Sequence, residues 1–225
     1  MLNQLKTHNR LYETAFMGAL TLCCFSLSVF RVVYSDTKTF LFLNWNLFLA
    51  FIPWVLSSLA VIKPSIQKRK AAILFLLGIW LLFFPNAPYI LTDLFHLKTH
   101  ASMPIWFDLV LILSFAWTGL LFGFLSLWDI ERILSKSIRP HAVRCISGSL
   151  LFLASFGIYL GRYLRWNSWD ILTEPLRLLY DVGDRIINPF AHPRAWGVTL
   201  LMGLFLNIIY WSFRMVQNSR TRPPQ

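Results

Sequence analysis

Asp93 and His96 are the residues of this sequence whose types and spacing best suit chemistry. Residues three apart share one face of a helix, so the carboxylate would lie beside the imidazole. Such a pair could act as a general acid and base, or could bind a divalent cation. A surface carboxylate beside a solvated histidine is the commoner arrangement. No cofactor is identified, and a divalent cation has no further support.

Asp108 is a third candidate for a catalytic role. It follows Trp106 and Phe107 at the expected outer end of an apolar run. A carboxylate at a helix N-terminus is stabilised by backbone N–H groups that lack a partner within the helix. Capping of the helix therefore explains Asp108 about as well as a function does.

Two arginines, Arg162 and Arg165, end another apolar run and could bind an anion. A charge near the boundary between acyl chains and headgroups is costly unless it is paired or reaches the surface. Because a guanidinium suits bidentate contact with a carboxylate or a phosphate, two interpretations stay open. The arginines could clasp Asp93 or Asp108 and staple helices together, or they could hold an anionic lipid headgroup or a phosphorylated substrate. Further candidate ligand-binding residues are Asn86, Asn167 and Asp170.

Pro85 and Pro88 interrupt the third apolar run beside Asn86. Proline removes a backbone donor and disturbs the hydrogen-bond ladder of a helix. Backbone groups freed at membrane depth must be buried in protein or line a wet cavity. Asn86 could satisfy part of that demand, or the irregular helix end could shape a site.

The elements that must position these residues are long apolar runs. Hydrophobic residues make up 56% of the 225 residues and charged residues only 14%, against about 25% in a soluble domain. Six runs have the length that a membrane-spanning helix needs. The sequence therefore predicts an all-α polytopic bundle, a single domain over residues 1–218 with a disordered tail at 219–225. The expected spans are about 14–33, 41–62, 71–91, 106–128, 145–161 and 195–214.

The distribution of Lys and Arg predicts the orientation. With the N-terminus in the cytoplasm, 13 of these residues fall on the inner side and 8 on the outer side. The positive-inside rule then places both termini in the cytoplasm. It also explains the net charge of +11 better than nucleic-acid binding does, because the basic residues lie between apolar runs. The lipid bilayer is the expected partner.

The last outer loop contains a predicted amphipathic helix at about 174–187. Thr173-Glu174-Pro175 has the form of a helix start, and the apolar residues that follow fall on one face. Ion pairs are expected between Arg177 and Asp181 and between Asp181 and Arg185. The helix could lie in the outer interface of the membrane or could cap the bundle.

Two small-residue pairs predict close helix contacts. Gly119 and Gly123 lie one turn apart in the fourth run, and Gly157 and Gly161 in the fifth. Such pairs let helices approach closely in lipid. Gly148 is the expected inner-leaflet match for Gly119 and Gly123.

Four blocks of the sequence resemble a family of bacterial multi-pass membrane proteins, domain of unknown function 1361. They are residues 46–53, 84–94, 106–108 and 157–170, and Pro-Asn-Ala-Pro-Tyr is among the specific motifs. The resemblance covers roughly residues 44–211. It implies a bacterial inner-membrane location, and it implies no activity, substrate or catalytic residue.

The unusual polar residues all map to the outer ends of the expected helices. The inner loops are basic without comparable structure, and the middles of the runs contain no ionisable residue. The first hypothesis is therefore a binding or catalytic site on the outer face that acts on an envelope lipid or glycan precursor. The alternative is a non-catalytic membrane partner or assembly subunit, which would bind another membrane protein. A small-solute transporter ranks last, because such proteins place polar groups near the midplane.

Overall fold

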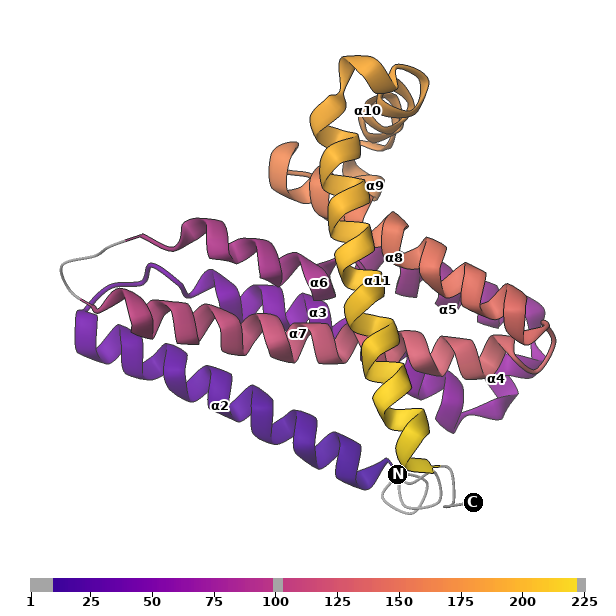
Figure 1. Ribbon diagram of the computed structural model, residues 1–225, viewed down its shortest axis with the longest axis horizontal. Helices are drawn as coiled ribbons and strands as arrows, with labels where there is room; N and C mark the ends of the chain where they lie inside the picture. Colours follow the sequence, from indigo (N-terminus) through magenta and orange to yellow (C-terminus); the bar gives the residue numbers. More distant parts are fainter. Residues whose placement is uncertain (1–9, 99–102, 222–225) are drawn as a thin grey trace. The chain divides into compact units, whose positions relative to one another are not determined.

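The computed structural model describes residues 10–98 and 103–221, and the elements in this part of the chain are α-helices and 3₁₀ helices (Figure 1). Six of the helical segments are long and apolar enough to cross a membrane. The prediction of an all-α bundle with six spans is confirmed, and the protein is a multi-pass membrane protein. Contacts within the chain divide it into two compact units, residues 1–137 and 138–225.

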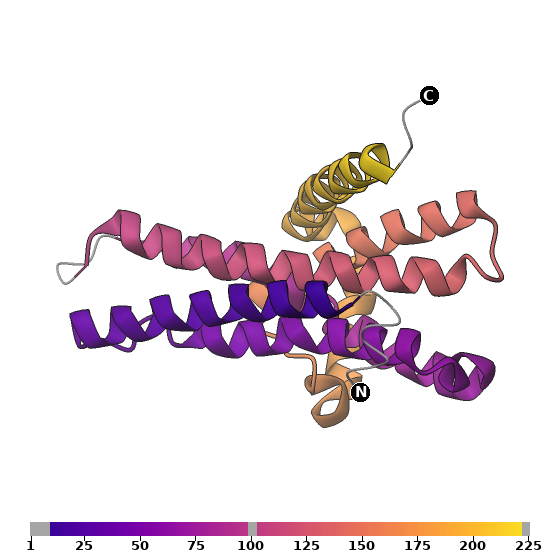
Figure 2. The same ribbon diagram turned by 90° about the horizontal axis from the view of Figure 1, so that it is seen from below.

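Unit 1 contains four of the six spans. Its elements are α2 (Leu11–Ser35), α3 (Phe42–Ile62), α4 (Pro64–Lys68), α5 (Lys70–Phe83), α6 (Asn86–Tyr89), the 3₁₀ helix η1 (Ile90–His96) and α7 (Ile105–Leu134). α7 is the central helix, because it contacts α2, α3, α6 and η1. Figures 1 and 2 show α2 and α3 running beside it. α7 holds more buried residues than any other helix of unit 1.

The third span breaks where the prolines predict. α5 ends at Phe83, and the short helix α6 and η1 continue to His96. The Asn86 amide donates to the carbonyl of Phe83 at 2.9 Å. Asn86 therefore satisfies a backbone carbonyl oxygen at the break, as the structural interpretation predicts.

The broken segment packs against the glycines of α7. A Cβ atom added to Gly119 would lie 2.9 Å from the carbonyl oxygen of Ala87, and one added to Gly123 would lie 2.8 Å from the Ala87 Cβ. Gly148, the expected match, instead lies against the side chain of Asn207. The prediction that Gly148 packs against Gly119 and Gly123 was wrong. Residues at the same depth in a membrane need not belong to neighbouring helices.

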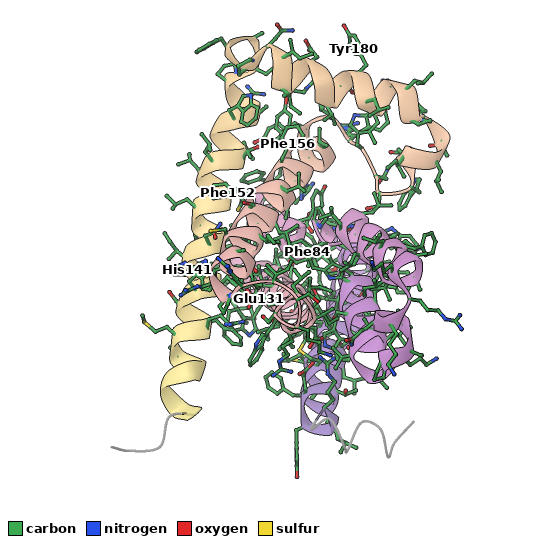
Figure 3. All side chains as sticks on the ribbon, turned by 90° about the vertical axis from the view of Figure 1, so that its right-hand side faces the viewer. Phe84, Glu131, His141, Phe152, Phe156 and Tyr180 are labelled. Atoms are coloured by element: carbon green, nitrogen blue, oxygen red, sulfur yellow. The ribbon has the colours of Figure 1, made fainter. Side chains whose placement is uncertain are left out.

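Unit 2 contains the last two spans. Its elements are α8 (Pro140–Tyr163), α9 (Asp170–Thr173), α10 (Pro175–Ile187), the 3₁₀ helix η2 (Pro189–Ala191) and α11 (Pro193–Thr221). α8 packs along α11. Phe152 lies so close to Gly203 of α11 that a Cβ atom there would clash with its ring. Figure 3 shows Phe152 and Phe156 on α8, and Tyr180 on the side of α10 away from them.

The helix predicted in the last outer loop is present as α10, and its apolar side chains are exposed. They are Leu176, Leu179, Tyr180, Ile186 and Ile187. The pair between Asp181 and Arg185 forms with an O–N distance of 3.0 Å. The expected pair between Arg177 and Asp181 was wrong, because Arg177 is bonded at 2.9 Å to Glu174, one turn earlier.

The helices extend beyond the charged residues that marked their ends in the sequence. α2 continues four residues past Arg31, and α7 continues five past Asp129. α11 runs to Thr221, so only residues 222–225 of the predicted tail lie outside the described residues. Arg31 and Asp129 do not mark the ends of their helices, because both charges are buried in ion pairs and do not need to reach the membrane surface.

Candidate functional site

Asp93 and His96 come together at one end of unit 1. Both lie on η1, and the His96 Nδ1 is 3.9 Å from the Asp93 Oδ1. The Asn46 amide of α3 donates to the other carboxylate oxygen at 2.8 Å. The side chain of Asp93 is 1% exposed, whereas that of His96 is 47% exposed. A buried, fixed carboxylate therefore borders an imidazole that reaches the surface.

The His96 ring also has an apolar neighbour. It lies 5.2 Å, centroid to centroid, from the ring of Phe42 on α3. Phe95, Trp45 and Trp106 at this end of unit 1 are more than half exposed. Exposed aromatic side chains of this kind are enriched at the level of lipid headgroups. The imidazole thus has a carboxylate on one side and an aromatic ring on the other.

Asp108 lies in a different environment at the same end of unit 1. It is the fourth residue of α7 and lies in the first turn of that helix, after the N-cap Pro104. Its carboxylate accepts two hydrogen bonds from Arg31 of α2, from Nε at 2.7 Å and from Nη2 at 3.2 Å. Arg31 also donates to Thr37 and lies over the ring of Phe40. Both charges are almost fully buried.

Asp108 is therefore held by Arg31 of α2, whereas the sequence analysis offered Arg162 or Arg165 for this role. Arg31 was counted from the sequence among the basic residues of the outer side. A long apolar run that stops at a charge cannot show whether the helix itself stops there. Arg31 joins α2 to α7 with a bidentate contact, the geometry that makes such pairs specific.

A second ionic contact between α2 and α7 lies at their opposite ends, which sequence reasoning missed. Arg10 pairs with Asp129, and its Nη1 donates to the hydroxyl of Ser58 at 2.5 Å. Ser57 donates to the other oxygen of Asp129 at 3.0 Å. The helix ends that the sequence analysis assigns to the inner side therefore carry a buried polar cluster, where only basic loops without comparable structure were expected. Ser57 bonds to Asp129 and Ser58 to Arg10, and these partners can be found only when it is known which helices touch.

The remaining candidates lie in unit 2, at the turn that follows α8. Arg165 is exposed and adopts a left-handed backbone conformation, with φ of 62°. Asn167 donates to Asp170 from its backbone N–H, at 2.6 Å, and from its side-chain amide, at 3.2 Å. Arg162 is half-buried at the last turn of α8. Asn167 and Asp170 thus form a local turn. These candidates belong to unit 2, whereas Asp93, His96 and Asp108 belong to unit 1.

Unit 2 also holds an aspartate–histidine pair that the sequence interpretation did not single out. The His192 Nε2 lies 2.7 Å from the Asp184 Oδ2. Hydrogen bonds from Asn188 and His192 hold the pKa of the Asp184 carboxyl below its usual value. Together with the bond from Trp196 to the carbonyl of Arg185, at 2.9 Å, this pair fixes α10 to the start of α11.

The family of the chain follows from a match over residues 45–209, which include the proline-broken segment and the turn after α8. The chain belongs to the DUF1361 family, described as protein of unknown function. No curated protein and no solved structure matches it. Within the described residues, no group of three or more His, Cys, Asp and Glu side chains could hold a metal ion.

Proposed function

We propose that unit 1 carries a polar site on the outer face of a bacterial inner membrane, where it recognises the headgroup of an envelope lipid or glycan precursor. The observation that supports this proposal is the contrast in exposure between Asp93 and His96. The carboxylate lies 3.9 Å from Nδ1 of the ring, and the accessible imidazole can exchange a proton with a hydroxyl or phosphate group of a bound headgroup.

The proposed location rests on the charge bias of the loops and on the aromatic side chains near His96. With both termini in the cytoplasm, the end of unit 1 that holds Asp93 faces outward. Asn46 bonds to the buried carboxylate and so acts as a positioning residue for the imidazole. In this proposal His96 contacts the ligand, and Asp93 acts through His96. The anion-binding roles of Arg162, Arg165, Asn167 and Asp170 remain part of the proposal.

The test is complementation of a deletion strain, with membrane lipids and cell-wall precursors profiled by mass spectrometry. We expect His96→Ala and Asp93→Asn to leave the altered profile of the deletion strain uncorrected. Phe95→Ala is the matched control, because Phe95 is an exposed neighbour on the same 3₁₀ helix, and it should restore the profile. Immunoblots show whether each variant reaches wild-type levels. Full restoration by His96→Ala would rule out the proposed site.

A second candidate function, a non-catalytic assembly subunit, is favoured by the exposed apolar face of α10. That face also fits a helix lying in the lipid interface. Complementation of the same deletion strain distinguishes the two candidate functions. If a variant with Leu176→Ser and Leu179→Ser fails to complement while His96→Ala complements, the protein acts through this surface.

A further inference from the structure

An apolar groove lies on unit 1 between α2 and α3, at a distance along α2 from the site that contains Asp93. Its volume is about 780 Å³, within the usual range of about 300–1,000 Å³ for ligand pockets. Phe51, Trp54 and Phe122 line it and contact one another, with ring centroids 5.4–5.6 Å apart. Three interlocked aromatic rings give the groove a preformed wall.

The groove is polar at one end only. Arg10, Thr14 and Ser58 line the end near Asp129, whereas Phe25 and Phe48 line the other. The ordering follows from the antiparallel course of α2 and α3, because the start of one lies beside the end of the other. A pocket with one polar end and a long apolar body fits an amphiphile.

The length of the groove fits a lipid chain. Its lining on α2 runs from Arg10 to Phe25, which is about 22 Å at a rise of 1.5 Å per residue. One leaflet contributes about 15 Å of hydrocarbon. An acyl chain that enters at the polar end could therefore lie wholly within the groove.

The charges beside the polar end of the groove, where Glu13 neighbours the lining residue Arg10, can complement the headgroup of a lipid. Arg10 pairs with Asp129 and lies 3.7 Å from the Glu13 carboxylate. Trp54 donates to Glu13 at 2.9 Å and fixes it. The cluster thus contains one guanidinium and two carboxylates, and Glu13, with 26% of its side chain exposed, is the more accessible carboxylate. An accessible carboxylate complements an ammonium group.

We infer that this groove is a binding site for a membrane phospholipid whose headgroup carries an ammonium group. One acyl chain lies between α2 and α3, and the ammonium group lies at Glu13. The groove contains neither Asp93 nor His96, so this inference stands independently of the proposed function.

Gly18 offers a way to fill the groove without disturbing the fold. It lines the groove, and a Cβ atom placed on it meets nothing within 4 Å. Gly18→Phe therefore projects a ring into the space of the chain. Gly78→Phe is the matched control, because Gly78 on α5 is equally open and lies outside the groove.

The experiment is native mass spectrometry of the full-length protein, delipidated in detergent and titrated with phosphatidylethanolamine or phosphatidylglycerol of identical chains. We expect wild type and Gly78→Phe to retain one phosphatidylethanolamine at least tenfold more tightly than Gly18→Phe. Glu13→Gln should remove the preference for phosphatidylethanolamine. Size-exclusion profiles show that each variant is folded. Equal retention by wild type and Gly18→Phe would overturn the site, and equal binding of the two lipids by wild type would overturn the headgroup assignment.

Discussion

Asp93 and Asp108 are two buried carboxylates at the same end of unit 1 with different neighbours. Asp108 contacts the guanidinium of Arg31 through both of its oxygens. Asp93 contacts the amide of Asn46 and borders His96, a side chain that reaches the surface. Burial is therefore the same for both, and the partners differ.

The difference separates a structural role from a chemical one. A buried pair of opposite charges links helices, and neither charge is available to a ligand. A buried carboxylate beside an exposed imidazole leaves one group accessible and holds it in place. Residue type and burial alone do not distinguish these cases, so the neighbours of each carboxylate must be known.

The largest expected effect concerns Asp108, the carboxylate with the structural role. Asp108→Asn should lower the free energy of unfolding by about 3–5 kcal/mol, because it leaves the buried charge of Arg31 without its partner. Thermal unfolding in detergent, followed by intrinsic fluorescence, measures the loss. The double variant Arg31→Met with Asp108→Leu is the control, and it should recover most of the stability because it removes both charges. A single variant as stable as wild type would contradict the assignment of the staple.

Smaller losses of stability are expected for Asp93 and His96, the pair with the proposed chemical role. Asp93→Asn should lower the free energy of unfolding by about 1 kcal/mol, since it alters the buried hydrogen bond from Asn46. His96→Ala should change stability by less than about 0.5 kcal/mol, because its side chain is largely at the surface. The same unfolding assay checks both. A loss from His96→Ala as large as that from Asp108→Asn would erase the distinction between the two carboxylates.

The smallest effect concerns Asp184, a partly exposed carboxylate outside the spans. The bonds from Asn188 and His192 lower its pKa in the folded protein. The folded state therefore binds this proton less readily than the unfolded state, and the contact stabilises the fold above the ordinary pKa of aspartate, about 3.9. This stabilisation is lost as the pH falls below that value and through the lowered pKa. Unfolding temperatures of wild type and Asp184→Asn, compared between pH 3 and 6, should converge toward the acid end of this range. A constant difference over the range would contradict the prediction.

The spans and the proline break were predictable because the signals that specify them are local. An apolar run of sufficient length forms a helix in lipid whatever lies beside it, and Pro85 and Pro88 interrupt a helix through their own covalent structure. The amphipathic helix α10 followed from its periodicity in the same way. The one wrong ion pair in α10 was that of Arg177. Glu174 lies about one turn before Arg177 and Asp181 about one turn after it, and Arg177 pairs with Glu174.

The candidate site was predictable only where its residues are close in sequence. Asp93 and His96 are three residues apart, so their proximity follows from helical geometry. The contribution of Asn46 does not, because 47 residues separate it from Asp93. The pairing of Arg31 with Asp108 spans 77 residues and that of Arg10 with Asp129 spans 119.

The sequence by itself determined the number of spans, the helical breaks and the identity of the polar residues. The tertiary structure decided which of those residues are partners. The reason is physical: hydropathy and helical period act over one or a few turns, whereas a hydrogen bond or an ion pair requires contact within about 3–4 Å between helices that any order of packing could have brought together. Arg10, Ser58 and Glu13 appear in the sequence as unrelated residues. Only the packing of α2 on α3 and α7 brings Arg10 and Ser58 to the polar end of one groove, with Glu13 beside Arg10.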